Sequence, residues 1–534
     1  MRARFLIILA FSISLLGADK CGVPELFSLK STLDYERPEF SESLDSEDGH
    51  FRIWYTTDGP HAIDPTDISP SDGIPDWAQN AGEYLERAYA LLIDSLGARS
   101  PIPDSSGFPG ISNVGGDDRI DLYFVDMSTF YGNVYYGMTM PDTCHADGRC
   151  SAFITIENDF QAGDFPNYIG RENEALAVTC AHEFFHTIHF AYGYNAAWLW
   201  WMEATAVWSE ERNFDSVNDY IAYLPLFQNH PELGLDNNNP NGRIYGTCLF
   251  PIYISSIYGD SAIIDIWERI PGTTVFSALS DWADSIGVEL NSLYGDFARW
   301  NLFVGDYARP WGYSDAVLMP EPAHIEPFDC PDTLSGTGAA LYVDLSADDT
   351  GGIWARVGEI DDVSAVMFGI PQNGTDTPDT SVDVFIFEDT IAGVWRYQKL
   401  TVAISHLGRY STDRAWFEPI VYGPAPNARV VIPSDDLDAQ PYPNPFVYNT
   451  HHALYFPFDA NEDTPIRFSV WSSSAELVYD FSGNVNRGFH RTPEGAFGWY
   501  PSNSNGEILA SGVYLYWIAI ENDDYRGKFA IIRE

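Results

Sequence analysis

Residues 181–186 have the sequence Ala-His-Glu-Phe-Phe-His, and a Trp-rich segment follows them. On a helix, side chains four residues apart project from one face, so His182 and His186 can bind the same metal ion. Glu183 flanks that face, where the base for a metal-bound water must stand. With 12 His and 28 Glu among 534 residues, chance produces the motif only about 0.01 times. The motif therefore indicates a metal site and not two unrelated core histidines.

The third protein ligand must lie outside this motif. A catalytic zinc ion usually has three protein ligands and an open fourth position. His189 is one helical turn beyond His186, but three histidines spread over ~10 Å of one rigid helix are too far apart to share an ion. The metzincin pattern also fails, because Tyr192 stands where its third His is required. A carboxylate from the next element of the chain remains as the candidate.

The next helix supplies such a carboxylate. Asn195 can cap a helix that begins at Ala196, and this helix carries Glu203, Glu210 and Glu211. Glu203 is the predicted ligand, because the Ala-Thr-Ala that follows it lets two helices approach closely. Glu210 lies two turns further along the same face, and it is either a partner behind a ligand or a solvated helix end.

The two segments together resemble a known family. The His-Glu-x-x-His motif followed by Trp-Trp-Met-Glu-Ala-Thr-Ala-Val-Trp at residues 200–208 resembles the secreted bacterial zinc metallopeptidases of the gluzincin type. The resemblance implies that His182, His186 and Glu203 bind Zn²⁺. It also implies that Glu183 is the catalytic general base.

The resemblance has further implications around the site. The strand directly before the motif helix, residues 152–158, would form the edge of the cleft and pair with the substrate backbone. Val207 stands where the thermolysin-like members have an Asp, so the resemblance assigns no partner to His182. Tyr245 could hydrogen-bond an oxyanion, as a Tyr or His does in related peptidases. Packing at the start of a helix is the favoured interpretation of Tyr245.

Composition limits the classes of partner. A chain of 534 residues is too long for one hydrophobic core and suggests about three domains. The 77 acidic against 28 basic residues give a net charge of -49 and a pI near 4.2. A field of this sign repels nucleic acid and anionic membranes, so neither is an expected partner.

The N-terminus has the features of an export signal. Residues 1–18 combine a basic start with an apolar stretch that is too short to span a membrane, and they predict a signal peptide. Lys20 precedes Cys21 where a lipoprotein signal requires a small residue, so lipidation is not expected. No later stretch predicts a transmembrane segment. The protein is therefore expected to be secreted or held at the cell surface.

Six cysteines in an exported chain favour disulfides. Cys144 and Cys150 flank a short polar loop and are the expected pair. Cys180 lies two residues before His182, which directs it to the opposite side of the helix. It is interpreted as a structural residue, with Cys248 as a candidate partner.

An acidic, turn-rich segment precedes the first long helix. Residues 64–76 hold several carboxylates around Gly73, which suggests a Ca²⁺ loop, although the EF-hand pattern is not satisfied. Alternatively, Asp76 caps the following helix together with Gln79. Both interpretations stay open.

Strand-like alternation replaces helical spacing from about residue 330 and predicts a β-sandwich. A polar linker at residues 434–440 then leads to a second β unit, which closes with the pattern at residues 499–516. That pattern resembles the C-terminal sorting domains of the type IX secretion route of Gram-negative bacteria. The resemblance implies the outer-membrane secretion machinery as a partner.

The predicted architecture is an α+β zincin-like metallopeptidase domain followed by two all-β sandwich-type domains. The predicted boundaries are residues 1–18 for the signal peptide, 19–329 for the metallopeptidase domain, 330–433 for the β-sandwich and 434–534 for the sorting-like domain. The predicted function is zinc-dependent hydrolysis of a protein or peptide substrate. One alternative is a surface-displayed binding or adhesive protein with a catalytically idle zincin fold. Another is hydrolysis of a non-peptide amide or ester at the same site.

Overall fold

The computed structural model of the protein consists of two compact units. The first contains Met1–Ala323, Ser335–Ala340 and Ser405–Arg414, and the second contains His324–Leu334, Leu341–Ile404 and Ala415–Glu534. The structure describes residues 19–28, 37–103, 116–239, 241–325, 333–345, 354–356, 363–371, 383–386, 397–406, 414–416, 420–422, 441, 443–448, 451, 453–456, 465–472, 477–484, 490–491, 497–503, 508–520 and 523–533. The predicted signal peptide and the predicted linker at residues 434–440 lie outside these residues.

The first unit combines a six-stranded sheet with a set of helices. The strands are β1 (Asp19–Cys21), β2 (Glu42–Asp45), β3 (Phe51–Tyr55), β4 (Ile120–Val125), β5 (Tyr135–Cys144) and β6 (Cys150–Glu157), in the spatial order β1-β5-β6-β4-β3-β2. The helices are α1 (Val23–Ser28), α2 (Asp76–Tyr89), α3 (Met127–Tyr131), α4 (Glu172–Tyr192), α5 (Leu199–Asn213), α6 (Leu224–Gln228), α7 (Arg243–Gly246), α8 (Leu249–Tyr258), α9 (Ser261–Arg269), α10 (Val275–Ser285) and α11 (Leu290–Leu302).

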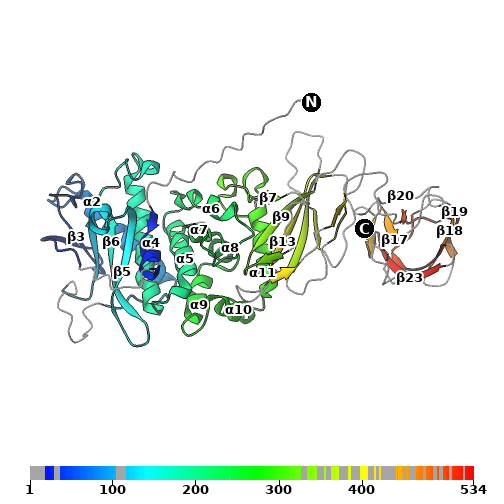
Figure 1. Cartoon of the computed structure of the whole chain (residues 1–534), viewed down its shortest axis with the longest axis horizontal. Helices are drawn as coiled ribbons and strands as arrows, with labels where there is room; N and C mark the ends of the chain where they lie inside the picture. Colours follow the sequence, from blue (N-terminus) through cyan, green and yellow to red (C-terminus); the bar gives the residue numbers. More distant parts are fainter. Residues whose placement is uncertain are drawn as a thin grey trace, which may run out of the picture. The chain divides into compact units, whose positions relative to one another are not determined.

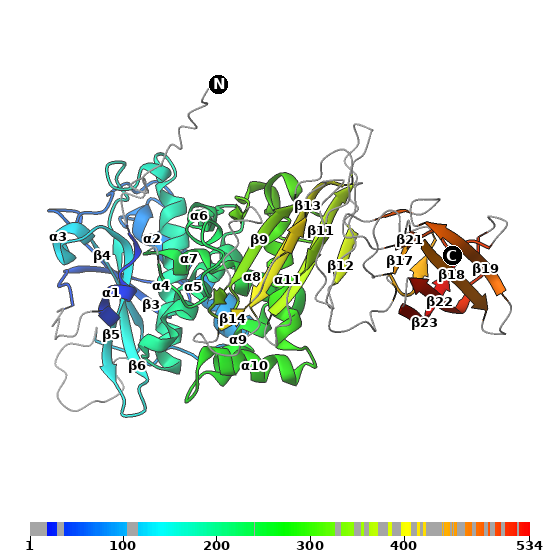
Figure 2. The same ribbon diagram turned by 45° about the vertical axis from the view of Figure 1, so that its right-hand side comes forward.

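Helix α4 is the central element of this unit. In Figures 1 and 2 it lies between the sheet and the helices α5, α7 and α8. Every residue from Ala175 to Tyr192 is buried, because α2, β5 and β6 pack on it from one side and α5 from the other. A helix that is buried on all sides can carry polar side chains only where other groups form hydrogen bonds or ion pairs with them. Its ionisable residues therefore need partners within the protein.

The structure confirms the predicted helix pair. The helix that carries the His-Glu-x-x-His motif is α4. Asn195 accepts a hydrogen bond from the backbone N–H of Ala197, as a helix cap does, and a short 3-10 turn leads from there into α5. The strand expected at residues 152–158 is β6.

The prediction that residues 152–158 form the cleft edge is wrong. β6 pairs antiparallel with β5 and parallel with β4, so both of its sides are already hydrogen-bonded. The difference arises because β5 turns back on β6 as a hairpin and takes the outer position. The hairpin is closed by the expected disulfide between Cys144 and Cys150. The outer side of β5 in turn pairs with β1.

A predicted cysteine pairing is also wrong. Cys180 and Cys248 are both buried, and both carry free thiols. Cys180 lies on the face of α4 that packs in the hydrophobic core, which agrees with its interpretation as a structural residue.

The capping interpretation of Asp76 is wrong as well. Pro75 occupies the cap position of α2 and makes no side-chain cap bond. The Asp76 carboxylate instead accepts hydrogen bonds from the backbone amides of Ile68 and Ser69. It therefore stabilises the preceding loop, and calcium binding by this loop stays a prediction.

Beyond Ala323 the described elements are strands. They are β7 (His324–Ile325), β8 (Thr333–Ser335), β9 (Ala340–Leu345), β10 (Trp354–Arg356), β11 (Val363–Pro371), β12 (Asp383–Ile386), β13 (Tyr397–His406), β14 (Arg414–Trp416), β15 (Ile420–Tyr422), β16 (Phe446–Val447), β17 (Leu454–Phe456), β18 (Pro465–Ser472), β19 (Leu477–Asn484), β20 (His490–Arg491), β21 (Phe497–Trp499), β22 (Gly512–Ile520) and β23 (Asp523–Ile532). They include the five-stranded sheets β12-β11-β13-β9-β7 and β16-β23-β22-β18-β19 and the three-stranded sheet β17-β21-β20. Phe456, Phe468 and Trp499 belong to one apolar core that the last two sheets share.

Within the described residues, no single helix has the length and apolarity needed to cross a membrane. The bent pair Arg243–Tyr258 and Ser261–Arg269 passes that test together, on length and composition alone.

The close approach of β5 to α4 gives a first prediction. A Cβ atom at Gly137 would lie 2.7 Å from Cγ of Glu183 and 2.9 Å from Cγ2 of Thr179. Gly137→Ala should therefore lower the free energy of unfolding by about 1–3 kcal/mol, as overpacking of a core does. Urea denaturation followed by near-UV circular dichroism measures the change.

Gly163→Ala is the control for this substitution, because a Cβ at Gly163 meets no atom within 4 Å. Equal stability of Gly137→Ala and the parent protein would contradict the close packing of β5 on α4.

Candidate metal centre

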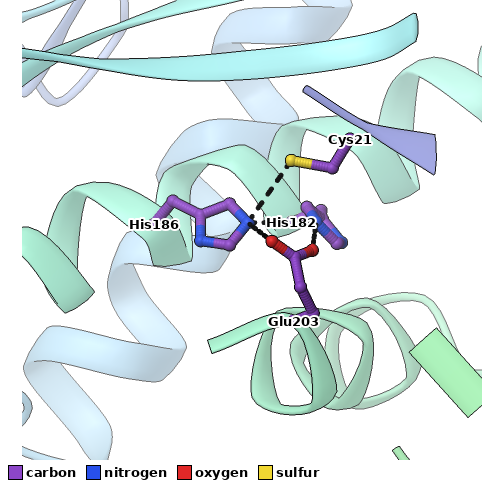
Figure 3. A group of neighbouring side chains, drawn as sticks. All are labelled: Cys21, His182, His186 and Glu203. Atoms are coloured by element: carbon purple, nitrogen blue, oxygen red, sulfur yellow. Dashed lines mark hydrogen bonds and ion pairs between the residues drawn. The ribbon is translucent and has the colours of Figure 1, made fainter. Parts of the chain in front are cut away.

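His182 and His186 bring two ring nitrogens to one point. Both lie in the middle of α4, and their Nε2 atoms are 3.2 Å apart. At most 1% of either side chain is exposed. Figure 3 shows the two imidazoles facing a carboxylate from the neighbouring helix. The predicted histidine pair is thus brought together at a single buried position.

Glu203 on α5 is that carboxylate. Its Oε2 lies 3.3 Å from Nε2 of His182, and its Oε1 lies 3.5 Å from Nε2 of His186. Neither oxygen has a hydrogen-bond partner among the described residues. Burial alone raises the pKa of Glu203, but the imidazoles of His186 and His182 lower it to about 2. A buried, ionised carboxylate that faces two ring nitrogens without a hydrogen bond is an arrangement that a cation completes.

Cys21 is a fourth member of the group, and it was not predicted. It ends β1, and its Sγ lies 3.6 Å from Nε2 of His186. One ligand atom from each of Cys21, His182, His186 and Glu203 lies within 4.8 Å of the others. Figure 3 shows these four side chains pointing toward one another. Burial, followed by the carboxyls of Glu183 and Glu203, raises the pKa of the Cys21 thiol well above its ordinary value. These four side chains can hold a divalent metal ion.

The sequence did not indicate that Cys21 binds a metal. The cysteine is 165 residues away from His186 in the chain, so no motif spacing connects them. The only signal in the sequence was the residue type, because cysteine thiolate is a common ligand of zinc.

Glu210 determines the orientation of His182. Its Oε1 lies 2.6 Å from Nδ1 of His182, which leaves Nε2 to face the metal position. Its Oε2 accepts a hydrogen bond from Nζ of Lys20 at 2.9 Å, and Lys20 also pairs with Asp219. Glu210 is 2% exposed. The interpretation of Glu210 as a solvated helix end is therefore wrong; the structure places it against His182, and the ligand role of His182 stays a prediction.

His189 supports the site without joining the ligand group. Its Nδ1 lies 3.2 Å from Nδ1 of His186, and its Nε2 lies 3.1 Å from Oγ1 of Thr205. Trp267 stacks on the ring, with centroids 4.5 Å apart. Burial, and then the neighbouring His186 and His182, lower the pKa of His189 well below its ordinary value. A neutral, fixed imidazole in this position orients the ring of His186.

Glu183 lies beside the ligand group and points toward β5. Its Oε2 accepts a hydrogen bond from Oγ1 of Thr139 at 2.7 Å. Its Oε1 is buried and has no hydrogen bond to the described residues. Burial raises the pKa of Glu183, although His182 and His186 act in the opposite direction. A carboxylate with a raised pKa beside a metal position is suited to accept and return a proton.

Tyr245 on α7 is a second neighbour of the group. Its hydroxyl donates a hydrogen bond to the backbone carbonyl of Cys21 at 3.2 Å, and its ring centroid lies 6.4 Å from that of His182. Packing alone, the favoured interpretation from the sequence, accounts for its burial but not for this polar contact.

Comparisons with known proteins show no family for this chain. No protein-family model and no curated protein sequence matches it. Among solved structures, PorZ, a bacterial surface component of the type IX secretion system of Porphyromonas gingivalis, matches at 14% identity over 24% of this chain and 14% of its own, with a TM-score of 0.15. A β-glucuronidase from Ruminococcus gnavus matches at 13% identity over 36% of this chain and 35% of its own, with a TM-score of 0.13. The chain thus spans about a seventh of PorZ and about a third of the glucuronidase, and scores this low support no shared fold.

The contact between Glu210 and His182 gives a second prediction. Glu210→Gln keeps the shape of the side chain but removes its charge, which weakens the hydrogen bond with Nδ1 of His182. The affinity for zinc should fall about 10- to 100-fold, as it does when the partner of a ligating histidine is lost. Competition with a chromophoric chelator measures the affinity. Glu174→Gln, on the partly exposed first turn of α4, is the matched control and should bind zinc as the parent does.

The protonation of His182 gives a third prediction. In the metal-free protein burial lowers the pKa of His182, but the neighbouring carboxyls of Glu203 and Glu210 raise it to about 9. A metal ion must displace this proton, so the apparent affinity should rise by at least about tenfold per pH unit as the pH increases toward 9. The same chelator competition at several pH values checks the slope. An affinity that does not change with pH would contradict histidine ligation.

Proposed function

We propose that the protein is a secreted zinc metallopeptidase. The observation that carries the proposal is the meeting of two imidazoles from α4 and one unpartnered carboxylate from α5, with Glu183 directly beside them. Two histidines and a glutamate are the ligands of one class of catalytic zinc site. A neighbouring glutamate that is not a ligand is the base that such a site requires.

The distances support zinc as the metal. Zn–N and Zn–O bonds of about 2.0–2.1 Å at tetrahedral angles place two such ligand atoms about 3.3 Å apart. The two Nε2 atoms of His182 and His186 are 3.2 Å apart. Their separations from the Glu203 oxygens are 3.3 and 3.5 Å. Each histidine nitrogen therefore lies from the other nitrogen, and from one oxygen of Glu203, at about the spacing of two ligands of one zinc ion.

The residues around the ligands perform separate tasks in the proposed reaction. Bound Zn²⁺ would lower the pKa of a coordinated water to about 7 and polarise the substrate carbonyl. Oε1 of Glu183 takes up the proton and afterwards delivers it to the leaving amine. Thr139 holds the other oxygen of Glu183, so Oε1 stays in position. Glu210 and His189 keep the two ligand rings oriented.

Secretion belongs to the same proposal. The predicted signal peptide and the sorting-like pattern at residues 499–516 would direct the protein to the cell surface or beyond, with the outer-membrane secretion machinery as partner. In support, the C-terminal strands form the sheets β16-β23-β22-β18-β19 and β17-β21-β20 around a common apolar core. A compact β module of this kind can be recognised as one unit.

One observation favours the alternative function. With Cys21, four side chains surround the metal position, and a zinc site with four protein ligands is normally structural. A surface-displayed binding protein with an idle metal site would have this ligand set. The two functions differ in whether the site can open to a substrate.

The role of Glu183 gives the fourth prediction. Glu183→Gln should retain zinc, because Glu183 is not a ligand, and it should lose hydrolysis of casein by roughly 10²- to 10⁴-fold. Zinc content is measured by elemental analysis. The substitution is made in the wild-type protein and in a Cys21→Ala background, because Cys21 lies at the metal position.

Glu174→Gln on the same helix is again the control, and it should leave both zinc content and hydrolysis unchanged. Hydrolysis that persists in Glu183→Gln at the rate of its parent would show that the assigned base is wrong.

A further inference from the structure

We infer that Cys21 is the fourth ligand of the metal and that residues 19–28, the β1–α1 segment, form a latch that keeps the proposed peptidase closed. The inference rests on the proposed function and adds a form of regulation to it. Four features of the first unit carry it: the position of the thiol, the strand that β1 adds to the sheet, the contact with Tyr245 and the buried anchor at Lys20.

The thiol occupies the place of a ligand. A Zn–S bond of about 2.3 Å and a Zn–N bond of about 2.0–2.1 Å at a tetrahedral angle separate sulfur and nitrogen by about 3.6 Å. The distance from Sγ of Cys21 to Nε2 of His186 is 3.6 Å. The thiol therefore fits as the fourth ligand of a tetrahedral site whose other three ligands are His182, His186 and Glu203.

The fourth vertex is the position that a catalytic site needs for water. Catalytic zinc sites keep this position open, and structural sites close it with a protein side chain. Cys21 lies opposite Gly137 on β5, and Gly137 packs so closely on Glu183 that a Cβ there would lie 2.7 Å from Cγ of Glu183, so the thiol lies near the proposed base. A base beside a permanently closed site would have nothing to deprotonate. The presence of Glu183 with a buried oxygen that makes no hydrogen bond to the described residues therefore favours a site that opens.

The backbone of the β1–α1 segment covers a second part of the site. β1 pairs in parallel with β5, with Asp19 opposite Tyr135 and Cys21 opposite Gly137. The N–H of Gly22 donates to the carbonyl of Gly137 at 3.1 Å. An extended peptide substrate binds most simply by adding a strand to a sheet edge beside the catalytic group. With β1 in place, that side of β5 is not available.

Tyr245 and an adjacent cavity support the inference that the segment lies where a substrate would bind. The Tyr245 hydroxyl donates to the carbonyl of Cys21, as an oxyanion donor would to the carbonyl of a substrate. A cavity of about 480 Å³ adjoins Cys21 and is lined by Pro24 and Phe27 of the segment as well as by Tyr135 and Tyr245. Departure of the segment would enlarge this cavity and expose the metal at its end.

Lys20 anchors the segment next to the ligands. The side chain is almost fully buried and forms ion pairs with Glu210 and Asp219. Removing one partner of a buried ion pair is strongly destabilising, so the anchored state is strongly favoured over a detached one. The latch is therefore closed in the resting protein, and loss of the Cys21 ligand shifts it toward the open state, in which β1 leaves the edge of β5.

The ligand set is tested on the full chain with zinc bound. Zinc K-edge X-ray absorption of the wild type should show one sulfur at about 2.3 Å besides nitrogen and oxygen at about 2.0–2.1 Å. The sulfur should disappear in Cys21→Ala. Cys248→Ala is the matched control, because it removes a buried free thiol outside the ligand group. It should keep the sulfur signal.

The latch is tested by hydrolysis of a quenched fluorescent peptide library with the same three proteins. A latch that leaves the site open about 1% of the time reduces activity on the order of 100-fold. Cys21→Ala should therefore hydrolyse the library about 100-fold faster than the wild type and Cys248→Ala. Elemental analysis confirms that each protein still contains zinc.

The outcomes separate the latch from the proposed function. Absence of sulfur in the wild type, with equal hydrolysis by wild type and Cys21→Ala, would overturn the latch and leave the peptidase intact. Sulfur in the wild type with no hydrolysis by zinc-loaded Cys21→Ala would overturn both the latch and the peptidase, and it would assign a structural zinc site. Loss of the sulfur signal in Cys21→Ala together with faster hydrolysis by that variant would support both the latch and the peptidase.

Discussion

Burial of four ionisable side chains at one point is the constraint on which the first unit depends. His182, His186, Glu183 and Glu203 are each 1% exposed or less. Transfer of a single charge into a protein interior costs several kcal/mol unless partners compensate for the lost hydration. The attraction between the imidazoles and the Glu203 carboxylate offsets part of the free-energy cost of their lost hydration. A divalent cation between them would complete the compensation, and the same ion would supply the proposed chemistry of the site.

The surrounding architecture follows from this requirement. α4 must be enclosed to exclude water from the ligands, and the sheet and α5 enclose it from two sides. Gly137 lets β5 approach the helix at the level of Glu183, and Thr139 on the same strand then reaches the Glu183 carboxylate. A larger residue at position 137 would separate the strand from the base that the strand positions. The geometry of the base is therefore decided by the packing of the sheet.

Sequence reasoning could find the parts of the site that lie on continuous helices. The spacing of His182 and His186 predicts α4, and the cap at Asn195 predicts the helix that carries Glu203. The structure also shows that Glu210 is buried against His182. The sequence left this open, because spacing places a residue on one face of a helix but does not say what covers that face. Cys21, Lys20 and Thr139 could not be found in this way, since they come from strands whose partners depend on sheet order. Strand order also explains why residues 152–158 were wrongly predicted to form the cleft edge. The sequence does not show which strand of a hairpin lies further out in the sheet, and β6 lies between β5 and β4.

The ion pair between Lys20 and Glu210 has a thermodynamic consequence. Glu210 contacts His182 with one oxygen and Lys20 with the other, so one carboxylate links the β1–α1 segment to the proposed metal position. Linkage of this kind is reciprocal. If docking of the segment strengthens retention of the ion, then the ion must strengthen docking of the segment to the same degree. Chelation would therefore loosen the N-terminal strand, and proteins with and without metal would differ in how readily another protease cuts them near this strand.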